Sequence, residues 1–401
     1  MANEPRYDLI LYGATGFTGK LTAAYLDTHP DLRDRPWAIA GRNEEGLQKV
    51  RATLKSDSVD VIACPLDNAK AVEKMVKSTK AIITTAGPYS TYEGDKLLGA
   101  CAKAGTHYSD LSGEGFWQRE MIDAFHSVAE ASGARIVLGG GVDSIPSDLG
   151  AFLALKAIGF EPASGDNVRL TGKYTEYSGS FSGGTLASGR ARNAAIKSGR
   201  LTKEALNDPY VLAPGAKGSP LEQRSLDGMA PNAKPHYELG HGWLIPFFMA
   251  AINAPVVRRS LALSGIDEQV TYRECCSPGM WSRISWLYTS RGLGYPLGEP
   301  INFNPKSGEG PPPWLLKQGA FSVEVTAEDS EGRRGKAVVS GKGDPGYGAT
   351  SKMLAELGLC LANDLKGAPA AAGVLTPSTA LGDALVDRLN FANSGDFMTL
   401  A

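Results

Sequence analysis

Apolar and polar positions follow two alternating patterns over the first third of the chain. Short apolar runs are separated by longer stretches in which apolar residues recur with helical spacing. Strands that alternate with helices in this way predict βαβ units, and therefore a parallel, doubly wound sheet with helices on both faces. The predicted strands are 7–12, 36–40, 59–63, 80–85, 106–109 and 135–138, and the predicted helices are 17–28, 43–55, 68–77, 91–104 and 116–132.

The pattern changes after Asp143. The sequence SIPSDLG predicts the start of a helix, because Pro146 suits a position in the first turn. Farther along, apolar and polar residues alternate with period two, as in antiparallel strands with one face on the core. The turn at 329–333 predicts a hairpin between the last two of these strands. The predicted elements are a helix at 144–160, strands at 166–175, 321–328 and 334–341, and helices at 347–361 and 378–391.

Proline- and glycine-rich stretches interrupt the second half of the chain. Residues 205–240 and 290–318 are typical of long ordered loops or of a covering lid. Within the second stretch, the three prolines at 311–313 predict a stiff connector on the surface. The last two predicted helices are expected to pack back on the N-terminal sheet, which would bring both ends of the chain to the same part of the molecule.

Composition excludes several classes of function. The chain has 401 residues, 42% of them hydrophobic and 21% charged, as in an ordinary globular protein. A formal net charge of −2, without a run of Lys and Arg, argues against a nucleic-acid partner. Five cysteines without a C-x-x-C spacing favour reduced, buried thiols and a cytoplasmic location. The polar first residues lead at once into a strand, so no signal peptide is expected.

Neither a membrane span nor a metal site is expected. The longest uncharged segment, 243–257, is short and contains two prolines. We interpret it as a buried wall or as an oligomer contact, which would make a homodimer, and a role at a membrane surface is the alternative. The histidines and cysteines show none of the paired spacings that hold a metal ion.

The first predicted strand runs directly into three glycines, Gly13, Gly16 and Gly19, and a helix follows. This G-x-x-G-x-x-G spacing is a variant of the dinucleotide-binding turn. The first glycine allows the tight turn, the second lets the backbone approach a pyrophosphate, and the third lets helix and strand pack closely. N–H groups at the helix start would face the phosphates, and Thr15 and Thr18 add hydroxyl donors. A plain structural turn is the alternative, but the position at the start of a βα array favours a nucleotide.

The end of the second predicted strand indicates which nucleotide. NAD sites usually carry an acidic residue about 20 positions beyond the glycines. Here Ile39 and Ala40 occupy that region, and Arg42 and Asn43 follow. A guanidinium can pair with a 2′-phosphate and stack on an adenine, so the sequence predicts NADP(H). An arginine that is simply solvated at a helix start is the alternative.

Other strand ends lie at the same edge of the predicted sheet. Asp67 follows the third strand, where it either borders the adenine or caps a helix. Small residues at 84–89 follow the fourth strand and would let the chain pass close to a ribose. The residues expected to bind the cofactor are Gly13, Thr15, Gly16, Phe17, Thr18, Gly19, Arg42, Asn43, Leu66, Asp67, Thr85, Ala86, Gly87, Pro88, Tyr89 and Asp110.

Reduction by a nicotinamide also needs a group that supplies a proton or polarises the substrate. Tyrosine, aspartate and serine residues stand where the fourth to sixth strands end. Tyr108, Asp143 and Tyr89 are the catalytic candidates: the phenol can donate a proton, and Asp143 can hold the nicotinamide amide or orient a water. Each also has a structural alternative as a buried hydrogen-bonding group. The further members of this set are Tyr92, Asp110 and Ser112.

Together these motifs resemble the saccharopine dehydrogenase-like oxidoreductases, particularly the trans-acting enoyl reductases. The resemblance rests on GATGFTG (13–19) with AGR (40–42), TTAGPYSTYEG (84–94), YSDLSGE (108–114), GVDSIPSDLG (141–150), GDPGYGATSKMLAE (343–356) and GVLTPSTALGDALVDRL (373–389). It implies a Rossmann domain at 1–150, an inserted mixed α/β substrate domain at 151–343, and C-terminal helices at 344–401 that return to the first domain.

The resemblance also implies that the segment 180–188 contacts the substrate or the nicotinamide. Its residues Ser182, Gly183, Gly184 and Thr185 form a small-residue turn before a helix and are expected to offer free N–H donors. A plain capping turn is the alternative. On the helix that follows, Arg190 and Arg192 either bind an acidic substrate or form a solvated face.

The leading hypothesis is an NADPH-dependent reductase of an electron-poor C=C or C=N bond. A largely apolar substrate, either a small molecule or a carrier-bound intermediate, suits the aromatic residues at 243–248 and Trp281, Trp286 and Tyr288. The resemblance implies a polyketide synthase or a carrier protein as partner. The alternatives are a dehydrogenase working in the oxidative direction and a non-catalytic NADP(H)-binding regulator of a synthase.

Overall fold

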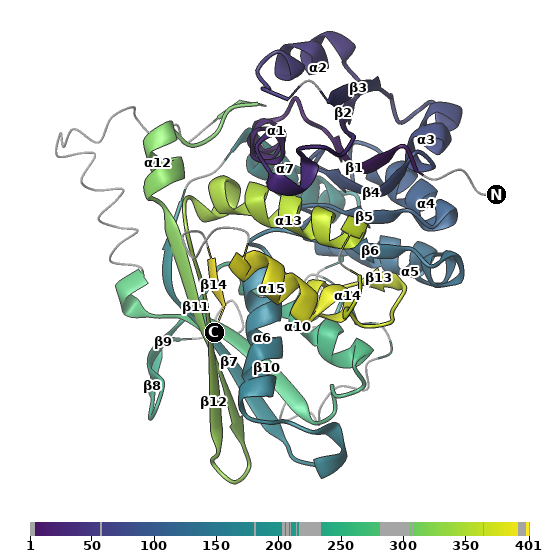
Figure 1. Cartoon of the computed structure of the whole chain (residues 1–401). Coiled ribbons are helices and arrows are strands. Elements are labelled where there is room, and N and C mark those ends of the chain that lie inside the picture. The colour runs from purple at the N-terminus through teal and green to yellow at the C-terminus, as the bar shows by residue number, and fades with distance from the viewer. Residues whose placement is uncertain are drawn as a thin grey trace, which may run out of the picture.

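The structure of the protein is a computed structural model that describes most of the chain (Figure 1). The described residues are 5–56, 58–179, 182–202, 205, 208, 210–213, 215, 234–280, 305–306, 308–363, 365–391 and 398–400. Trp281, Trp286 and Tyr288 lie outside these residues.

The N-terminal part forms a seven-stranded sheet in the order β13-β6-β5-β4-β1-β2-β3. All neighbouring strands in it are parallel. The order reverses between β1 and β4, which is where a doubly wound sheet binds its ligand. The strands are β1 (Tyr7–Tyr12), β2 (Trp37–Gly41), β3 (Val59–Ala63), β4 (Thr79–Thr84), β5 (His107–Ser109), β6 (Arg135–Val137) and β13 (Gly373–Leu375).

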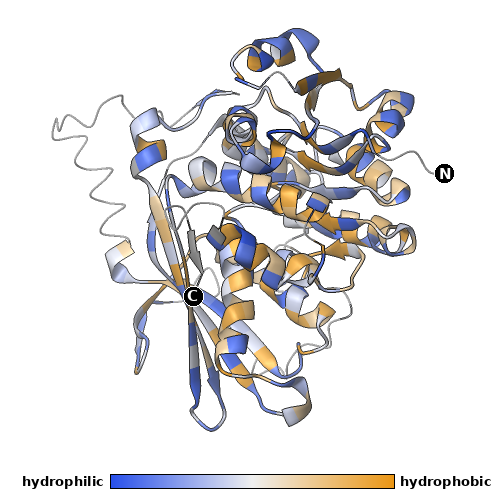
Figure 2. Ribbon diagram, in the orientation of Figure 1, coloured by the Kyte–Doolittle hydropathy of each residue, from blue (hydrophilic) through white to orange (hydrophobic). Residues whose placement is uncertain are grey.

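The central strands of this sheet are buried on both faces, which explains their uninterrupted apolar sequences. Alternate residues of β1 enter different cores: Leu9 and Leu11 belong to one hydrophobic cluster, and Ile10 and Tyr12 to the other. In Figure 2, the strands of this sheet lie in the upper part of the picture and are accordingly coloured mainly as hydrophobic. The helices around the sheet are α1 (Phe17–Asp27), α2 (Glu44–Arg51), α3 (Ala69–Val76), α4 (Gly94–Ala104), α5 (Gly115–Ser132) and α13 (Thr350–Asn363).

A second seven-stranded sheet, in the order β14-β12-β11-β7-β10-β9-β8, follows in the chain. It is mixed, because β10 runs parallel to β7 and the other pairs are antiparallel. The hairpin between β11 and β12 forms as predicted, and its tip is hydrophilic (Figure 2). The strands are β7 (Val168–Ser178), β8 (His236–Glu238), β9 (Gly242–Pro246), β10 (Val270–Cys276), β11 (Ala320–Asp329), β12 (Arg334–Lys342) and β14 (Met398–Leu400).

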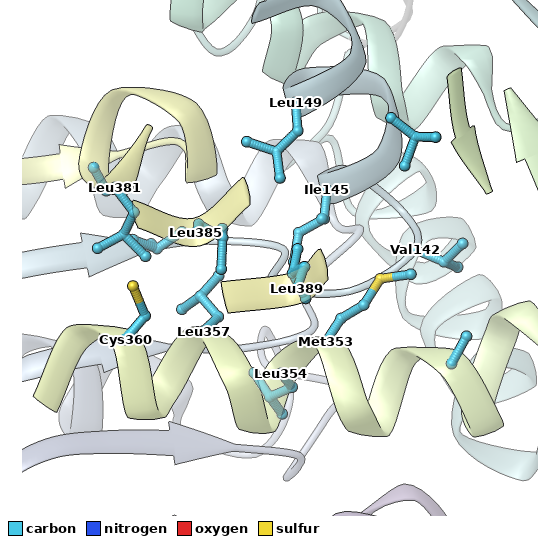
Figure 3. Close-up of a cluster of buried hydrophobic side chains, with 14 of the residues drawn as sticks. Val142, Ile145, Leu149, Met353, Leu354, Leu357, Cys360, Leu381, Leu385 and Leu389 are labelled. Atoms are coloured by element: carbon cyan, nitrogen blue, oxygen red, sulfur yellow. The ribbon is translucent and has the colours of Figure 1, made fainter. Parts of the chain in front are cut away.

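Helices join the two sheets into one body. The helix α13 packs on β4, β1 and β5, while α6 packs on β12 and β11. Between them lies an apolar cluster that includes Ile145, Leu149, Met353, Leu357 and Leu385 (Figure 3). The remaining helices are α6 (Ile145–Ala157), α7 (Gly183–Lys197), α10 (Ala250–Leu263), α12 (Pro313–Gln318), α14 (Pro377–Leu381), α15 (Asp383–Phe391) and the short η1 (Pro30–Leu32), η2 (Pro162–Ser164) and η3 (Pro345–Ala349).

These observations confirm the predicted α/β class and the doubly wound first sheet. The prediction of a surface connector at 311–313 is wrong: Pro311 and Pro312 are buried, and Pro313 begins α12, where a proline is tolerated because its missing N–H has no helical partner. The segment 243–257 spans β9 and the first half of α10, and part of it is a buried wall, since Phe247 and Ala254 belong to the core. Within the described residues, all helices fall short of the length and apolarity that crossing a bilayer requires.

Candidate cofactor and substrate site

The glycine turn connects β1 to α1 at the point where the strand order reverses. Gly13 has φ +86°, a conformation that favours glycine, and its N–H donates to the carbonyl of Ala40 over 2.8 Å. Gly16 is the N-cap of α1, and no side chain caps this helix. The N–H groups of its first turn are therefore available to an anion, with the positive end of the helix dipole behind them.

Steric contacts fix the shape of this turn. A Cβ on Gly19 would lie 2.3 Å from the carbonyl oxygen of Gly13, and a Cβ on Gly13 would lie 2.8 Å from the backbone nitrogen of Ala86. A Cβ on Gly16 would meet only one atom, at 3.4 Å. Two glycines are thus required by the protein's own backbone, while Gly16 faces open space in which a diphosphate fits.

Arg42 and Asn43 follow β2 beside the turn. The exposed Arg42 guanidinium lies 5.6 Å from the centre of the Tyr92 ring, in cation–π contact. Asn43 caps α2 by accepting the N–H of Gly46. After β3, the helix α3 is capped by Asn68, so the alternative of a capping role for Asp67 is wrong. Leu66 is buried, whereas Asp67 is exposed.

The chain after β4 returns to the glycine turn. The Thr85 hydroxyl donates to the carbonyl of Gly13 over 3.0 Å, and Thr85 and Gly87 line a cavity. Ala86 and Pro88 lie between and beyond them in the same segment. The Tyr89 hydroxyl donates a hydrogen bond to the Thr84 carbonyl and accepts one from the N–H of Leu111. It is therefore bonded to the backbone both as donor and as acceptor.

Tyr108 and Asp110 form a buried network at the end of β5. The Tyr108 hydroxyl donates to Asp110 over 3.0 Å, and burial raises the pKa of Tyr108 well above its ordinary value. Asp110 also accepts the N–H groups of Ser112 and Gly139, and the Ser112 hydroxyl. Neither Tyr108 nor Asp110 is among the residues that line the cavity. Their arrangement is that of a structural brace between the ends of β5 and β6.

The cavity has a volume of about 490 Å³ and lies between the glycine turn and the helices α7 and α10. One side is formed by residues of the glycine turn and by residues that follow the strands β4, β5 and β6. Another side is apolar and comes from α10 and the residues just before it. The lining residues that matter below are Thr18, Thr85, Gly113, Glu114, Asp143, Ser182, Thr185, Ser188, Gly189, Arg192, Phe248, Met249, Ile252, Pro255 and Tyr347.

Tyr89 and Asp143 are the catalytic candidates that line this cavity, and Asp143 stands out because the Tyr89 hydroxyl is already bonded to the backbone. Burial raises the pKa of Asp143 to about 6. Its Oδ2 lies near Gly113, where a Cβ would be 3.5 Å from both that oxygen and the side chain of Ile252. A carboxyl group that is partly protonated near neutral pH and adjoins an apolar wall can donate a proton inside the cavity.

The turn at Ser182–Thr185 also lines the cavity, but most of its N–H groups are already bonded. The N–H of Ser182 donates to the Tyr347 hydroxyl, that of Gly183 to the Glu309 carbonyl, and that of Thr185 to the Ser182 side chain. The prediction of free N–H donors is therefore wrong for these three residues. Ser182 caps α7, as the alternative proposed.

Tyr347 and Glu114 are two of the cavity residues that were not predicted. Tyr347 holds the α7 turn through Ser182 and Thr185, and its ring packs edge-on against Phe17, with ring centres 5.4 Å apart. The sequence signal for Tyr347 was its place in GDPGYGATSK, one of the segments that carry the resemblance. Glu114 is only 5% exposed: its Oε2 accepts the N–H of Ser90, and its Oε1 has no hydrogen-bond partner among the described residues.

Comparison with known proteins decides the family. Residues 9–137 match the saccharopine dehydrogenase NADP-binding domain. A trans-acting enoyl reductase of Mycobacterium tuberculosis is 33% identical over 406 residues, and the alignment covers 96% of each chain. The enzyme of the same name from Mycobacterium leprae is 33% identical over 416 residues, again with 96% of each chain covered. The chain belongs to the saccharopine dehydrogenase-like oxidoreductases.

A solved structure supports the same fold. Apo saccharopine dehydrogenase (L-Glu forming) from Saccharomyces cerevisiae has a TM-score of 0.51, with 98% of this chain and 99% of that chain covered, at 13% identity. As a saccharopine dehydrogenase-like oxidoreductase, the chain is an NADPH-dependent reductase, which confirms the predicted enzyme class and cofactor. The open side of Gly16 and the uncapped start of α1 fit a dinucleotide diphosphate.

Proposed function

We propose that the protein reduces an activated C=C bond in a largely apolar intermediate, either a small molecule or a carrier-bound chain. One observation carries the proposal: the cavity that adjoins the cofactor turn has an apolar wall of Phe248, Met249, Ile252 and Pro255. Such a wall suits a hydrocarbon substrate and excludes water from the reacting bond. The relatives named trans-acting enoyl reductase support the C=C bond over the C=N bond.

The cofactor is proposed to lie along the carboxyl edge of the first sheet. The first turn of α1 would bind the diphosphate, and Arg42, stacked on Tyr92, would bind the 2′-phosphate. Thr85 and Gly87 would border the ribose next to the nicotinamide. We accordingly assign 1–150 to cofactor binding, 151–343 to the substrate, and 344–401 to the helices and strands that join both sheets.

The proposed chemistry needs few groups from the protein. NADPH supplies a hydride to the electron-poor carbon when it is bound. Asp143 donates a proton to the carbon that becomes electron-rich, because its carboxyl group faces the cavity and keeps its proton at higher pH than usual. Asp110, Tyr108 and Tyr89 hold the strand ends in place, so that Asp143 stays at a fixed distance from the cofactor edge.

The word trans-acting in the relatives' names supports a synthase, or its carrier protein, as the partner. We propose the same arrangement for this chain, with the substrate delivered by another protein rather than made on a covalently joined module. A cytoplasmic location and a homodimer stay predictions. Size-exclusion chromatography with light scattering, alone and with a candidate carrier protein, measures both the homodimer and the complex.

The decisive experiment measures NADPH oxidation by the purified protein with three substrate classes. Enoyl thioesters with a long acyl chain should be turned over, while simple enones and cyclic imines should react slowly or not at all. Turnover of imines alone would replace the C=C proposal by a C=N proposal. Tight NADPH binding without turnover of any class would leave a regulator as the function.

A further inference from the structure

One face of α7 runs along the cavity and ends in a cation. Thr185, Ser188, Gly189 and Arg192 line the cavity, and their spacing of three, four and seven residues places them on one side of the helix. The first three are small and polar, so a substrate chain can lie close to the helix. Only the last position carries a charge.

The two ends of this face are chemically different. Thr185 bonds to Tyr347, whose ring packs on Phe17 of the glycine turn, so this end lies beside the cofactor. Arg192 lies seven residues farther on, about 10 Å along the axis at the usual rise of an α-helix. The cation is therefore remote from the bond that is reduced.

Arg192 is exposed, and in the part of the chain that the structure describes it has no ion-pair or hydrogen-bond partner. Among the described residues, no carboxylate forms an ion pair with it, although three carboxylates line the same cavity. Glu114 is engaged with the Ser90 N–H, and Asp208 with the Tyr210 N–H, while Asp143 lies near Gly113. The whole of α7 contains three cations and no acidic residue. The guanidinium is thus free to bind an anion from outside.

In contrast to the polar α7 face, the wall formed by α10 and the residues just before it is apolar. Phe248, Met249, Ile252 and Pro255 are apolar, the last three are spaced three residues apart, and Phe248 is 45% exposed. The cavity therefore combines an apolar wall with a polar, small-residue face that ends in a cation. An amphiphilic substrate with an anionic end matches this combination.

We propose that Arg192 is the anion subsite of the substrate channel, and that it binds a phosphate located about 10 Å or more from the double bond. A guanidinium binds phosphate with two parallel hydrogen bonds. A free enoic acid does not fit, because its carboxylate adjoins its double bond. The inference rests on the proposed reductase function and adds the residue that recognises the phosphate of an acyl chain's arm, whether that arm is free or attached to a carrier protein.

The test measures equilibrium binding of unreactive acyl compounds to the NADP⁺-loaded protein by calorimetry. The probes are S-dodecanoyl pantetheine, which is uncharged, and its 4′-phosphate. In the wild type the phosphate should tighten binding about tenfold, and 0.5 M NaCl should reduce this gain. The Arg192→Ala variant should bind both probes equally. Arg190→Ala is the matched control, since Arg190 is exposed on the same helix but does not line the cavity.

Each outcome decides a separate point. Equal binding of both probes by the wild type, or an equal loss in both arginine variants, overturns the subsite but leaves the reductase proposal standing. Failure of both probes to bind overturns the acyl substrate and the subsite together. A third probe, the same phosphorylated acyl arm on a purified carrier protein, separates the two sources: tighter binding than the free arm identifies a carrier, and equal binding identifies the free thioester.

Discussion

Two small-residue turns lead into helices beside the cavity, and they differ in what their N–H groups do. The glycine turn before α1 has no side-chain cap, and its shape is set by backbone contacts around Gly13 and Gly19. The turn before α7 is capped by Ser182, and Tyr347 and Glu309 accept two further N–H groups. The first turn is therefore suited to binding an anion, whereas the second positions a helix whose side chains line the cavity.

The difference shows that glycine and hydroxyl residues before a helix do not identify an anion site by themselves. Both turns have that composition, yet only the turn after β1 leads into a helix whose first N–H groups have no side-chain cap; the N–H groups of Gly13 and Gly16 themselves bond to the backbone. What distinguishes them is whether another segment supplies acceptors. Around the α7 turn, Tyr347 and Glu309 supply them, and both come from parts of the chain far from Ser182 in sequence.

The largest effect should come from exchanging glycine for alanine in the two turns. Gly19→Ala places a methyl group 2.3 Å from the Gly13 carbonyl, so it should abolish measurable NADPH binding and lower the free energy of unfolding by about 3 kcal/mol. Gly184→Ala is the control, because its Cβ would meet only the Ser182 hydroxyl at 3.4 Å. NADPH fluorescence and thermal unfolding measure both variants. Equal losses in the two turns would show that they do not differ as described.

The next effect concerns two carboxylates near the cavity. Asp143→Asn should lower kcat about 100-fold and leave NADPH affinity unchanged, because it removes a proton donor. Asp110→Asn should instead lower the free energy of unfolding by about 1–3 kcal/mol, because Asp110 serves four hydrogen-bond donors. Steady-state kinetics and denaturant titration separate the two. A kcat of Asp143→Asn within twofold of wild type would remove Asp143 from the chemistry.

The pH dependence of kcat provides a second test of Asp143 as the proton donor. Its pKa is raised to about 6 by burial, so the protonated form is present below that value and is lost above it. We expect kcat to fall as pH rises through about 6, and Asp143→Asn to remove that step. The same raised pKa means that protonated Asp143 favours the folded state at low pH, and that this contribution is lost as pH rises through about 6. A pH profile that is the same in both proteins would contradict this assignment.

A smaller effect is expected at Arg42. Arg42→Glu should lower NADPH affinity about 30-fold and leave NADH affinity nearly unchanged, since the exposed guanidinium is proposed to bind only the 2′-phosphate. Titration of each coenzyme gives the ratio directly, with NADH as the internal control. An unchanged NADPH/NADH ratio would place Arg42 outside the cofactor site.

The smallest effect is expected at Tyr347, which contacts both turns. Tyr347→Phe keeps the ring contact with Phe17 but removes the hydroxyl that accepts the Ser182 N–H and bonds to Thr185. We expect KM for an acyl substrate to rise about fivefold, because the α7 face shifts, while NADPH affinity stays constant. Weaker NADPH binding with unchanged KM would assign Tyr347 to the cofactor side instead.

Local patterns predicted the first sheet well. The apolar runs that became β1, β2, β4, β5 and β6 are mainly buried strands, β3 at the edge is partly exposed, and the glycine turn follows β1 as its spacing required. Strands outside the βα array were missed, among them β8, β13 and the seven-residue β10, whose residues are all buried and show no alternation of apolar and polar positions. Glu114 was also missed, since nothing local indicates that its Oε1 lacks a partner within the protein.

The sequence by itself determined the doubly wound sheet, the glycine turn and the preference for NADP(H), because these depend on residues that are neighbours in the chain. Only the tertiary structure decided which candidates line the cavity. Tyr108 and Asp110 are hydrogen-bonded to each other and do not line the cavity. Asp143 and Arg192 line it and come from different segments of the chain. Hydrogen-bond partners and cavity walls come from elements that are distant in sequence, so no local pattern specifies them.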